Sequence, residues 1–187
     1  MCLRDCPSSA GPKILRARQW RTGMKTLLRV LGLILVGLLL LLVVLRITGF
    51  GPRGNTPGLW LKGDLVTTPV ADWSFTDKFE TVNVQTNTRY LLPHSVTTYC
   101  VAYNGQLYLT SVYRAGLTYP HGRSWNEDVA RDPHVRIKIG NQLYDRTLSY
   151  VTDQAERASV IEAKRKKYPQ QKIPATSTIN VFHVLDN

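Results

Sequence analysis

The sequence is poor in cysteine: it has three, Cys2, Cys6 and Cys100. The first two lie near the N-terminus, so Cys100 is the only thiol of the C-terminal part and has no nearby partner for a disulfide. That part of the chain must therefore be stabilised by a hydrophobic core. The Cys2–Cys6 pair has no further metal ligands close to it in the sequence, so it does not predict a metal site.

Motifs for metal and hydrolase chemistry are also missing. The four histidines show neither H-x3-H nor H-E-x-x-H spacing, and no carboxylate stands at metal-ligand spacing from them. There is no G-x-S-x-G elbow, phosphate-binding glycine loop or catalytic Cys–His pair. The sequence therefore predicts no metal site, and it leaves His94, before a hydroxyl-rich strand, as the one weak candidate for a proton-donating or ligand-contacting side chain.

Acidic residues are scarce near the N-terminus, where residues 1–53 contain nine Lys or Arg and only Asp5 as a counter-charge. The net charge of +11 thus resides mostly in this segment, and residues 54–187 carry about +3. A domain with so small an excess lacks the basic surface that nucleic-acid binding needs. We therefore expect no nucleic-acid partner.

A long apolar run follows the first seven basic residues. Residues 30–45, VLGLILVGLLLLLVVL, are uncharged, and the stretch 27–50 is long enough to cross a bilayer if Arg29 and Arg46 reach the two interfaces. A cleaved signal peptide is the alternative, but no small-x-small cleavage site follows the run. We predict a transmembrane anchor over residues 27–50, which makes the lipid bilayer a partner of the chain.

The charge bias predicts the topology. Because basic residues precede the span, the positive-inside rule places the N-terminus in the cytoplasm. The domain then lies outside the inner (cytoplasmic) membrane, in the periplasm of a bacterium. Residues 1–26 are either a basic cytoplasmic tail or, in part, an upstream extension, because Met24 would also serve as a start. The Gly- and Pro-rich residues 51–58 read as a flexible linker, and 59–187 as the domain.

Within residues 59–187 the pattern is mainly that of strands. Alternating or β-branched segments cover 79–86, 95–103, 106–112, 134–139, 142–151 and 177–184. Asn104-Gly105 and Gly140-Asn141 suit tight hairpin turns. In the fourth segment Val135, Ile137 and Ile139 face inward.

Two helices are predicted between these strands. Ser124 and Glu127 have capping-box spacing for a helix to about Arg131, ended by Asp132-Pro133. Thr152 or Asp153 begins a second helix, 153–168. About six antiparallel strands with two flanking helices predict an α+β, mainly β domain: a small closed barrel preceded by one transmembrane helix.

Several of these segments in combination resemble a known superfamily. They are a Tyr-x-Asn-Gly-x-Leu-Tyr-Leu hairpin, a Trp-containing helix ending in Arg-Asp-Pro-His-Val-Arg, a Gly-Asn turn and a Val-Thr-Asp-x-x-Glu-Arg helix ending in Lys-Lys-Tyr-Pro. Over residues 76–184 the chain looks like the split β-barrel superfamily, which includes pyridoxamine-phosphate-oxidase-like flavin proteins and deazaflavin-dependent nitroreductases. The resemblance implies a split β-barrel, FMN or a deazaflavin as cofactor, and a homodimer.

The resemblance also implies a phosphate clamp at the barrel mouth, where TSVYRAGLTYPHGR precedes the short helix. By residue type and position the expected cofactor-binding residues are Ser111, Arg114, Arg123 and Trp125, with Arg89 and His94 as second choices. The structural alternative is that Arg114 and Arg123 are solvated loop residues and that Trp125 belongs to the core.

Two functions follow from these expectations. One is a membrane-anchored flavin- or deazaflavin-dependent oxidoreductase acting on a small or lipophilic acceptor. The other is a cofactor-free exported barrel that binds a ligand or membrane partner without catalysis. The second is favoured by the lack of a twin-arginine signal for folded export before the apolar run.

Overall fold

The structure, a computed structural model, describes residues 13–90, 92–113, 116–174 and 176–186, with side chains from Met24 onward. The chain divides into two compact units, Met1–Val44 and Leu45–Asn187, which are treated separately below.

The first helix, α1, runs from Lys13 to Thr48. Its segment Met24–Thr48 is long and apolar enough to cross a membrane by length and composition. The large apolar side chains of this segment are exposed, for example Leu33 at 73% and Leu40 at 61%. A helix of this length and composition near the N-terminus is typical of a membrane anchor or of a signal sequence.

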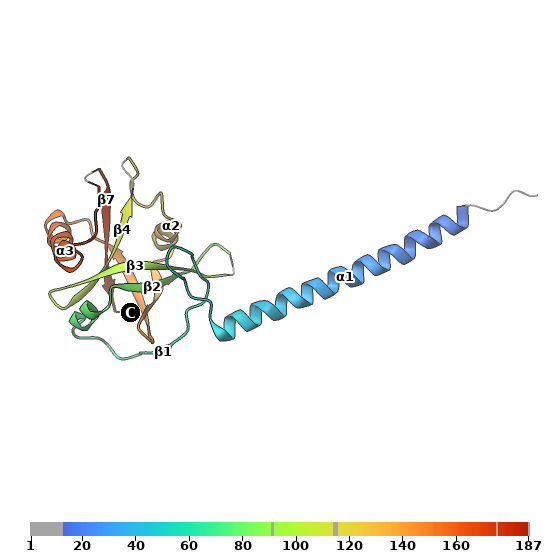
Figure 1. The fold of residues 1–187 in the computed structure, drawn as a ribbon, viewed down its shortest axis with the longest axis horizontal. Helices are drawn as coiled ribbons and strands as arrows, with labels where there is room; N and C mark the ends of the chain where they lie inside the picture. The colour runs from blue at the N-terminus through green and yellow to red at the C-terminus, as the bar shows by residue number, and fades with distance from the viewer. Residues whose placement is uncertain (1–12, 91, 114–115, 175, 187) are drawn as a thin grey trace, which may run out of the picture. The chain divides into compact units, whose positions relative to one another are not determined.

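The second unit is a closed antiparallel barrel (Figure 1). Its strands are β2 (Thr81–Thr86), β3 (His94–Tyr103), β4 (Gln106–Tyr113), β5 (His134–Ile139), β6 (Gln142–Tyr150) and β7 (Thr178–Leu185). They pair in the order β6-β5-β2-β3-β4-β7, and β7 returns to β6 to close the ring. A two-residue strand, β1 (Asp64–Leu65), pairs in parallel with the start of β6. The predicted barrel of six antiparallel strands is confirmed.

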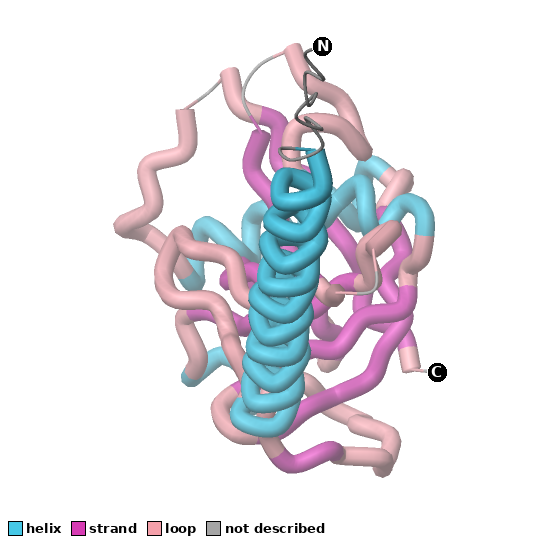
Figure 2. The backbone as a smooth tube through the Cα atoms, turned by 90° about the vertical axis from the view of Figure 1, so that its right-hand side faces the viewer, coloured by secondary structure: helices cyan, strands magenta, loops and turns pink. Residues whose placement is uncertain are grey.

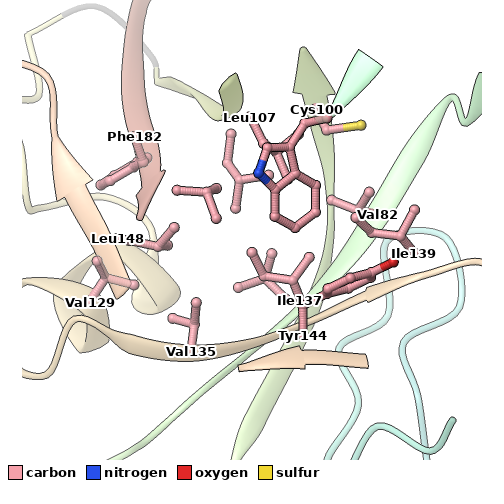
Figure 3. Close-up of a cluster of buried hydrophobic side chains, with 14 of the residues drawn as sticks. Val82, Cys100, Leu107, Val129, Val135, Ile137, Ile139, Tyr144, Leu148 and Phe182 are labelled. Atoms are coloured by element: carbon pink, nitrogen blue, oxygen red, sulfur yellow. The ribbon is translucent and has the colours of Figure 1, made fainter. Parts of the chain in front are cut away.

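Side chains that alternate along the strands fill the barrel. Val82 and Val84 on β2, Leu107 and Leu109 on β4, and Ile137 on β5 are at most 2% exposed. Figure 3 shows the cluster of buried side chains, from all six strands, converging on one centre. As predicted, Val135, Ile137 and Ile139 point inward, because successive side chains of a strand lie on opposite faces.

Two tight turns set the registers of the hairpins. Asn104 and Gly105 both have positive φ, 50° and 75°, and connect β3 to β4 with Tyr103 opposite Gln106. Gly140 has φ 60° and, with Asn141, connects β5 to β6. Both predicted turns are confirmed, and the positive φ explains the residue types at Asn104, Gly105 and Gly140.

Two α-helices and a short 3-10 helix, η1 (Ser74–Lys78), lie at the periphery of the barrel (Figure 2). Helix α3 (Gln154–Lys167) begins at Asp153, whose side chain accepts a hydrogen bond from the Glu156 amide at 2.7 Å. Its Val160 is buried in an apolar cluster with Tyr108, Val151, Ile179 and Val181. The predicted second helix and its cap are confirmed.

Helix α2 (Ser124–Arg131) is present as predicted, but its N-terminus differs from the capping-box prediction. The cap position is Arg123, and no side-chain hydrogen bond caps the helix. Ser124 lies instead in the first turn of the helix, where its side chain is exposed.

The stretch 51–58, predicted to be a linker, is bonded to the barrel in this structure. The Gly58 amide donates to the Ser95 carbonyl at 2.8 Å, and the Ser95 amide donates back at 2.9 Å. Just before Gly58, Arg53 and Thr56 bond to each other and close a small turn. Gly58 therefore adds a short antiparallel bridge to the start of β3.

Candidate functional site

The candidate site is a groove between helix α2 and the connection from β2 to β3. Its volume is about 510 Å³, and we call it the α2 groove. Its lining residues are Thr88, Arg89, Tyr90, His94, Ser124, Glu127, Asp128 and Arg131. A volume of this size is typical of sites for small ligands and cofactors.

The helical period explains which side chains of α2 reach the groove. Trp125 and Val129 are buried against the barrel, so they mark the inner face of the helix. Ser124, Asp128 and Arg131 stand three or four residues apart in an adjacent stripe, which lines the groove. One wall of the site is therefore a polar stripe of a helix whose apolar stripe holds it on the barrel.

A histidine and a carboxylate meet at the inner end of the groove. His94 Nδ1 lies 3.8 Å from Asp128 Oδ2, and the two side chains are only 21% and 13% exposed. That nitrogen is buried and has no hydrogen-bond partner among the described residues. Asp128 also accepts a hydrogen bond from the Thr86 hydroxyl at 3.1 Å and from Arg131 Nη1 at 3.2 Å.

The connection between β2 and β3 is attached to the end of α2. The Asn87 amide group donates to Asp132 Oδ2 at 2.8 Å, and Arg131 donates to the Asn87 carbonyl. The pKa of Asp132 is lowered, first by the hydrogen bond from Asn87 and then by that from His134. Thr88 steadies the same connection through bonds from its hydroxyl to the carbonyls of Tyr90 and Leu92. The two walls of the groove are thus coupled by polar contacts.

Cationic donors in the groove suit an anionic ligand. Arg131 and Arg89 line opposite walls, and no ion pair within the described ranges occupies Arg89. Guanidinium groups present paired donors to phosphate oxygens, and the exposed Ser124 adds a hydroxyl. Glu127 and Asp128 oppose this, but Asp128 is already neutralised in part by Arg131. The donor set fits the phosphate-bearing part of a ligand.

The structure separates the residues expected to form one phosphate clamp. Arg89 and His94, the second choices, line the α2 groove. Arg123 is exposed, lines a different cavity of about 510 Å³ beside Tyr113 and Leu117, and donates to the Val112 carbonyl at 3.3 Å. Arg114 lies outside the described residues.

The other two predicted residues are buried. Ser111 is 4% exposed on β4, opposite Asn180 of β7, at the end of the barrel near α2. Trp125 is 5% exposed, and its ring centre lies 5.2 Å from that of Phe182. Neither residue lines a cavity that contains Arg89 or His94.

A polar cluster fills this end of the barrel. The Tyr150 hydroxyl donates to Asn180 Oδ1 at 3.1 Å, and the Asn126 amide group donates to the Tyr113 hydroxyl. Burial raises the pKa of Tyr113, so this phenol stays protonated at neutral pH. Asn126 Oδ1 and Asn180 Nδ2 are buried without partners among the described residues.

Sequence reasoning missed Ser124, Asp128 and Arg131 as site residues. It treated Ser124 as a cap and did not use the spacing of the three side chains on one face of the helix. The period of an α-helix applied to SWNEDVAR places Trp125 and Val129 in one stripe and Ser124, Asp128 and Arg131 in a neighbouring stripe. The contact between Asp128 and His94, in contrast, depends on how α2 packs beside β2 and β3.

No protein-family model matches the sequence, and no curated protein matches it. Solved structures are similar to it at low identity. A conserved hypothetical protein from Mycobacterium tuberculosis is 12% identical with a TM-score of 0.49, over 67% of this chain and 84% of that one. An F420-H2-dependent reductase is 25% identical with a TM-score of 0.43, over 57% and 94%. A NimC/NimA family protein from Clostridium acetobutylicum is 13% identical with a TM-score of 0.43, over 58% and 76%.

Proposed function

We propose that this protein is a membrane-anchored barrel that binds a phosphate-bearing cofactor in the α2 groove, FMN or a deazaflavin, and that it acts as an oxidoreductase on a small or lipophilic acceptor. The observation that carries the proposal is the set of groups around the groove. A groove of about 510 Å³ is lined by the guanidinium groups of Arg89 and Arg131, the exposed hydroxyl of Ser124 and His94. The Nδ1 atom of His94 is buried and has no hydrogen-bond partner among the described residues.

Each group has a role in this proposal. Arg89 and Arg131 bind phosphate oxygens, and Ser124 donates a further hydrogen bond. His94 lines the groove with its Nδ1 3.8 Å from Asp128 Oδ2, and its ring can contact the bound ligand. A bound flavin or deazaflavin supplies hydride transfer, and the protein contributes binding and orientation.

The alternative is a cofactor-free barrel that binds a ligand without catalysis. It is favoured by the two carboxylates, Glu127 and Asp128, that share the groove with the arginines. Carboxylates lower the affinity for a doubly charged phosphate, so the groove would then take a ligand of smaller negative charge.

The test uses the full-length chain in detergent micelles. Its absorbance is recorded, and FMN and the deazaflavin F420 are titrated by fluorescence. We expect binding that Arg89→Ala and Arg131→Ala each weaken by about 1–3 kcal/mol, or roughly 5- to 150-fold. Arg165→Ala, an exposed arginine of α3, is the matched control and should leave the affinity unchanged.

The outcomes separate the two functions. A colourless protein that binds neither cofactor would reject the oxidoreductase and leave the cofactor-free barrel. Binding that neither groove variant alters, with both variants folded by circular dichroism, would place the site elsewhere, with Arg123 and its cavity the next candidate.

Topology and oligomeric state are part of the proposal. We place the N-terminus in the cytoplasm and the barrel outside the inner membrane, which a compartment-specific reporter fused after residue 187 tests directly. The homodimer implied by the sequence resemblance stays a prediction, and light scattering of the detergent-solubilised protein measures it.

A further inference from the structure

Within the Leu45–Asn187 unit, the chain emerging from α1 is fixed beside a partly exposed tryptophan. Arg46 lies in the last turn of α1, and its guanidinium carbon is 5.6 Å from the centre of the Trp60 ring. The Phe50 amide donates to the Trp60 carbonyl at 2.9 Å, and the Leu59 amide donates to the Phe50 carbonyl at 2.7 Å. The point where the chain leaves the apolar helix is therefore defined relative to the barrel surface around it.

Exposed aromatic and apolar side chains surround this point. Tyr90 is 83% exposed, Leu92 37% and Phe50 44%. Arg46, Trp60, Tyr90 and Leu92 line one shallow cavity of about 180 Å³. We call Arg46, Phe50, Trp60, Tyr90 and Leu92 the exit surface.

We propose that the exit surface docks on the lipid bilayer, with Tyr90 and Leu92 inserted at the level of the headgroups. This rests on the proposed anchoring of the chain by α1. If Met24–Thr48 spans the membrane, chain connectivity alone requires that Arg46 and Phe50 lie at the bilayer surface. Side chains that share a cavity with Arg46 then lie within reach of the same surface.

The chemistry of the exit surface matches this partner. Tyrosine and tryptophan side chains favour the membrane interface, because their rings are apolar and one edge is polar. Arg46 supplies positive charge for lipid phosphates. Since the anchor keeps the barrel at the membrane, even weak insertion is favoured by the high local concentration of lipid.

The docking has a consequence for the α2 groove. Thr88 and Tyr90 line both the groove and the cavity of the exit surface. When the connection between β2 and β3 lies in the headgroup layer, one rim of the groove borders the bilayer.

The experiment measures contact between lipid and the exit surface in the full-length chain. In a Cys2→Ser, Cys6→Ser background, Cys100 is buried and stays unlabelled. Tyr90→Cys, or Leu92→Cys with Tyr90 retained, carries an environment-sensitive fluorophore. The matched control is Ala158→Cys, at an exposed position of α3, a helix on the opposite side of the barrel from the connection between β2 and β3 (Figure 1). Each protein is reconstituted into phosphatidylcholine–phosphatidylglycerol vesicles with brominated or ordinary acyl chains.

We expect bromination to reduce the emission at positions 90 and 92 by about twofold or more, and to leave position 158 unchanged. Equal emission at 90, 92 and 158, in protein that floats with the vesicles, would overturn the docking and leave the anchor intact. Accessibility to the aqueous quencher iodide and energy transfer between labelled copies are measured as well. If the labels are shielded from iodide, are not quenched by lipid and show energy transfer between copies, the surface binds a second copy of the chain instead. Failure to float would reject the proposed anchoring and the docking together. Failure of FMN and F420 to bind, with positions 90 and 92 quenched, would reject the proposed cofactor alone.

Discussion

His94 Nδ1 and the Asp128 carboxylate face each other at 3.8 Å, where β3 begins beside α2. Asp128 is held in place by Thr86 and Arg131, so its orientation does not depend on the histidine. The pair connects the barrel wall to the helix that covers it, and it forms the inner end of the α2 groove.

Asp128→Asn should strengthen the binding of an anionic ligand. The amide retains an acceptor for Thr86 and removes a negative charge from a groove that holds Arg89 and Arg131. We expect an affinity for FMN or inorganic phosphate about two- to fivefold higher at low salt, with the gain reduced by added salt. Calorimetric titration of the full-length protein measures it. A loss of affinity would show instead that Asp128 matters mainly for positioning Arg131.

Lys164→Met should stabilise the protein at neutral pH. Lys164 is 1% exposed, its amine donates to the Thr110 hydroxyl at 2.7 Å, and burial lowers its pKa from 10.5 to about 8. Below pH 8 the folded protein holds a buried charge, which lowers its stability. Each unit by which the pKa of Lys164 is lowered corresponds to about 1.4 kcal/mol of unfolding free energy. We expect the variant to be more stable by up to about 3 kcal/mol in urea unfolding at pH 7.

The pH dependence of that difference identifies its cause. Between pH 8 and 10.5 the unfolded chain binds a proton at Lys164 and the folded chain does not, so wild-type stability rises with pH and the advantage of the variant shrinks. Lys166→Met, an exposed lysine of the same helix, should show neither effect. An advantage that stays constant from about pH 7 to about pH 10 would indicate better packing by methionine instead.

Gly105→Ala should destabilise the β3–β4 hairpin. Gly105 has φ 75°, and an added Cβ would meet only Asp72 Oδ1 at 3.5 Å, an ordinary contact. The cost is therefore conformational, about 1–2 kcal/mol for an L-residue in the left-handed region. Gly51→Ala, at a position with ordinary φ and room for a Cβ, is the control and should be close to neutral in urea unfolding.

Trp125→Phe should affect stability rather than ligand affinity. The indole packs beside Phe182 in the core, so its truncation should cost about 1–3 kcal/mol of unfolding free energy. The affinity for FMN or F420 should stay within about twofold of wild type, since small changes in packing leave the groove residues in place. A variant that keeps its stability but loses affinity would support the predicted role of Trp125 as a cofactor-binding residue.

Local patterns predicted most of the fold. The alternation in HVRIKI, the two turn dipeptides and the apolar run before Arg46 act through neighbouring residues, so they can be recognised without the tertiary structure. The site was harder to predict from the sequence, because the predicted clamp grouped residues by chemical type and by closeness in the chain. The pleat of β4 turns Ser111 inward, and the period of α2 turns Trp125 inward, so neither lies beside Arg89.

The sequence by itself determined the apolar helix, the strands, their turns and the inward faces, since each depends on short-range periodicity and backbone preference. The tertiary structure alone decided that β7 returns to β6 and that α2 lies beside the start of β3. Those contacts join residues far apart in the chain. They follow from the best packing of the whole core, and they bring His94, Asp128 and the two arginines around one groove.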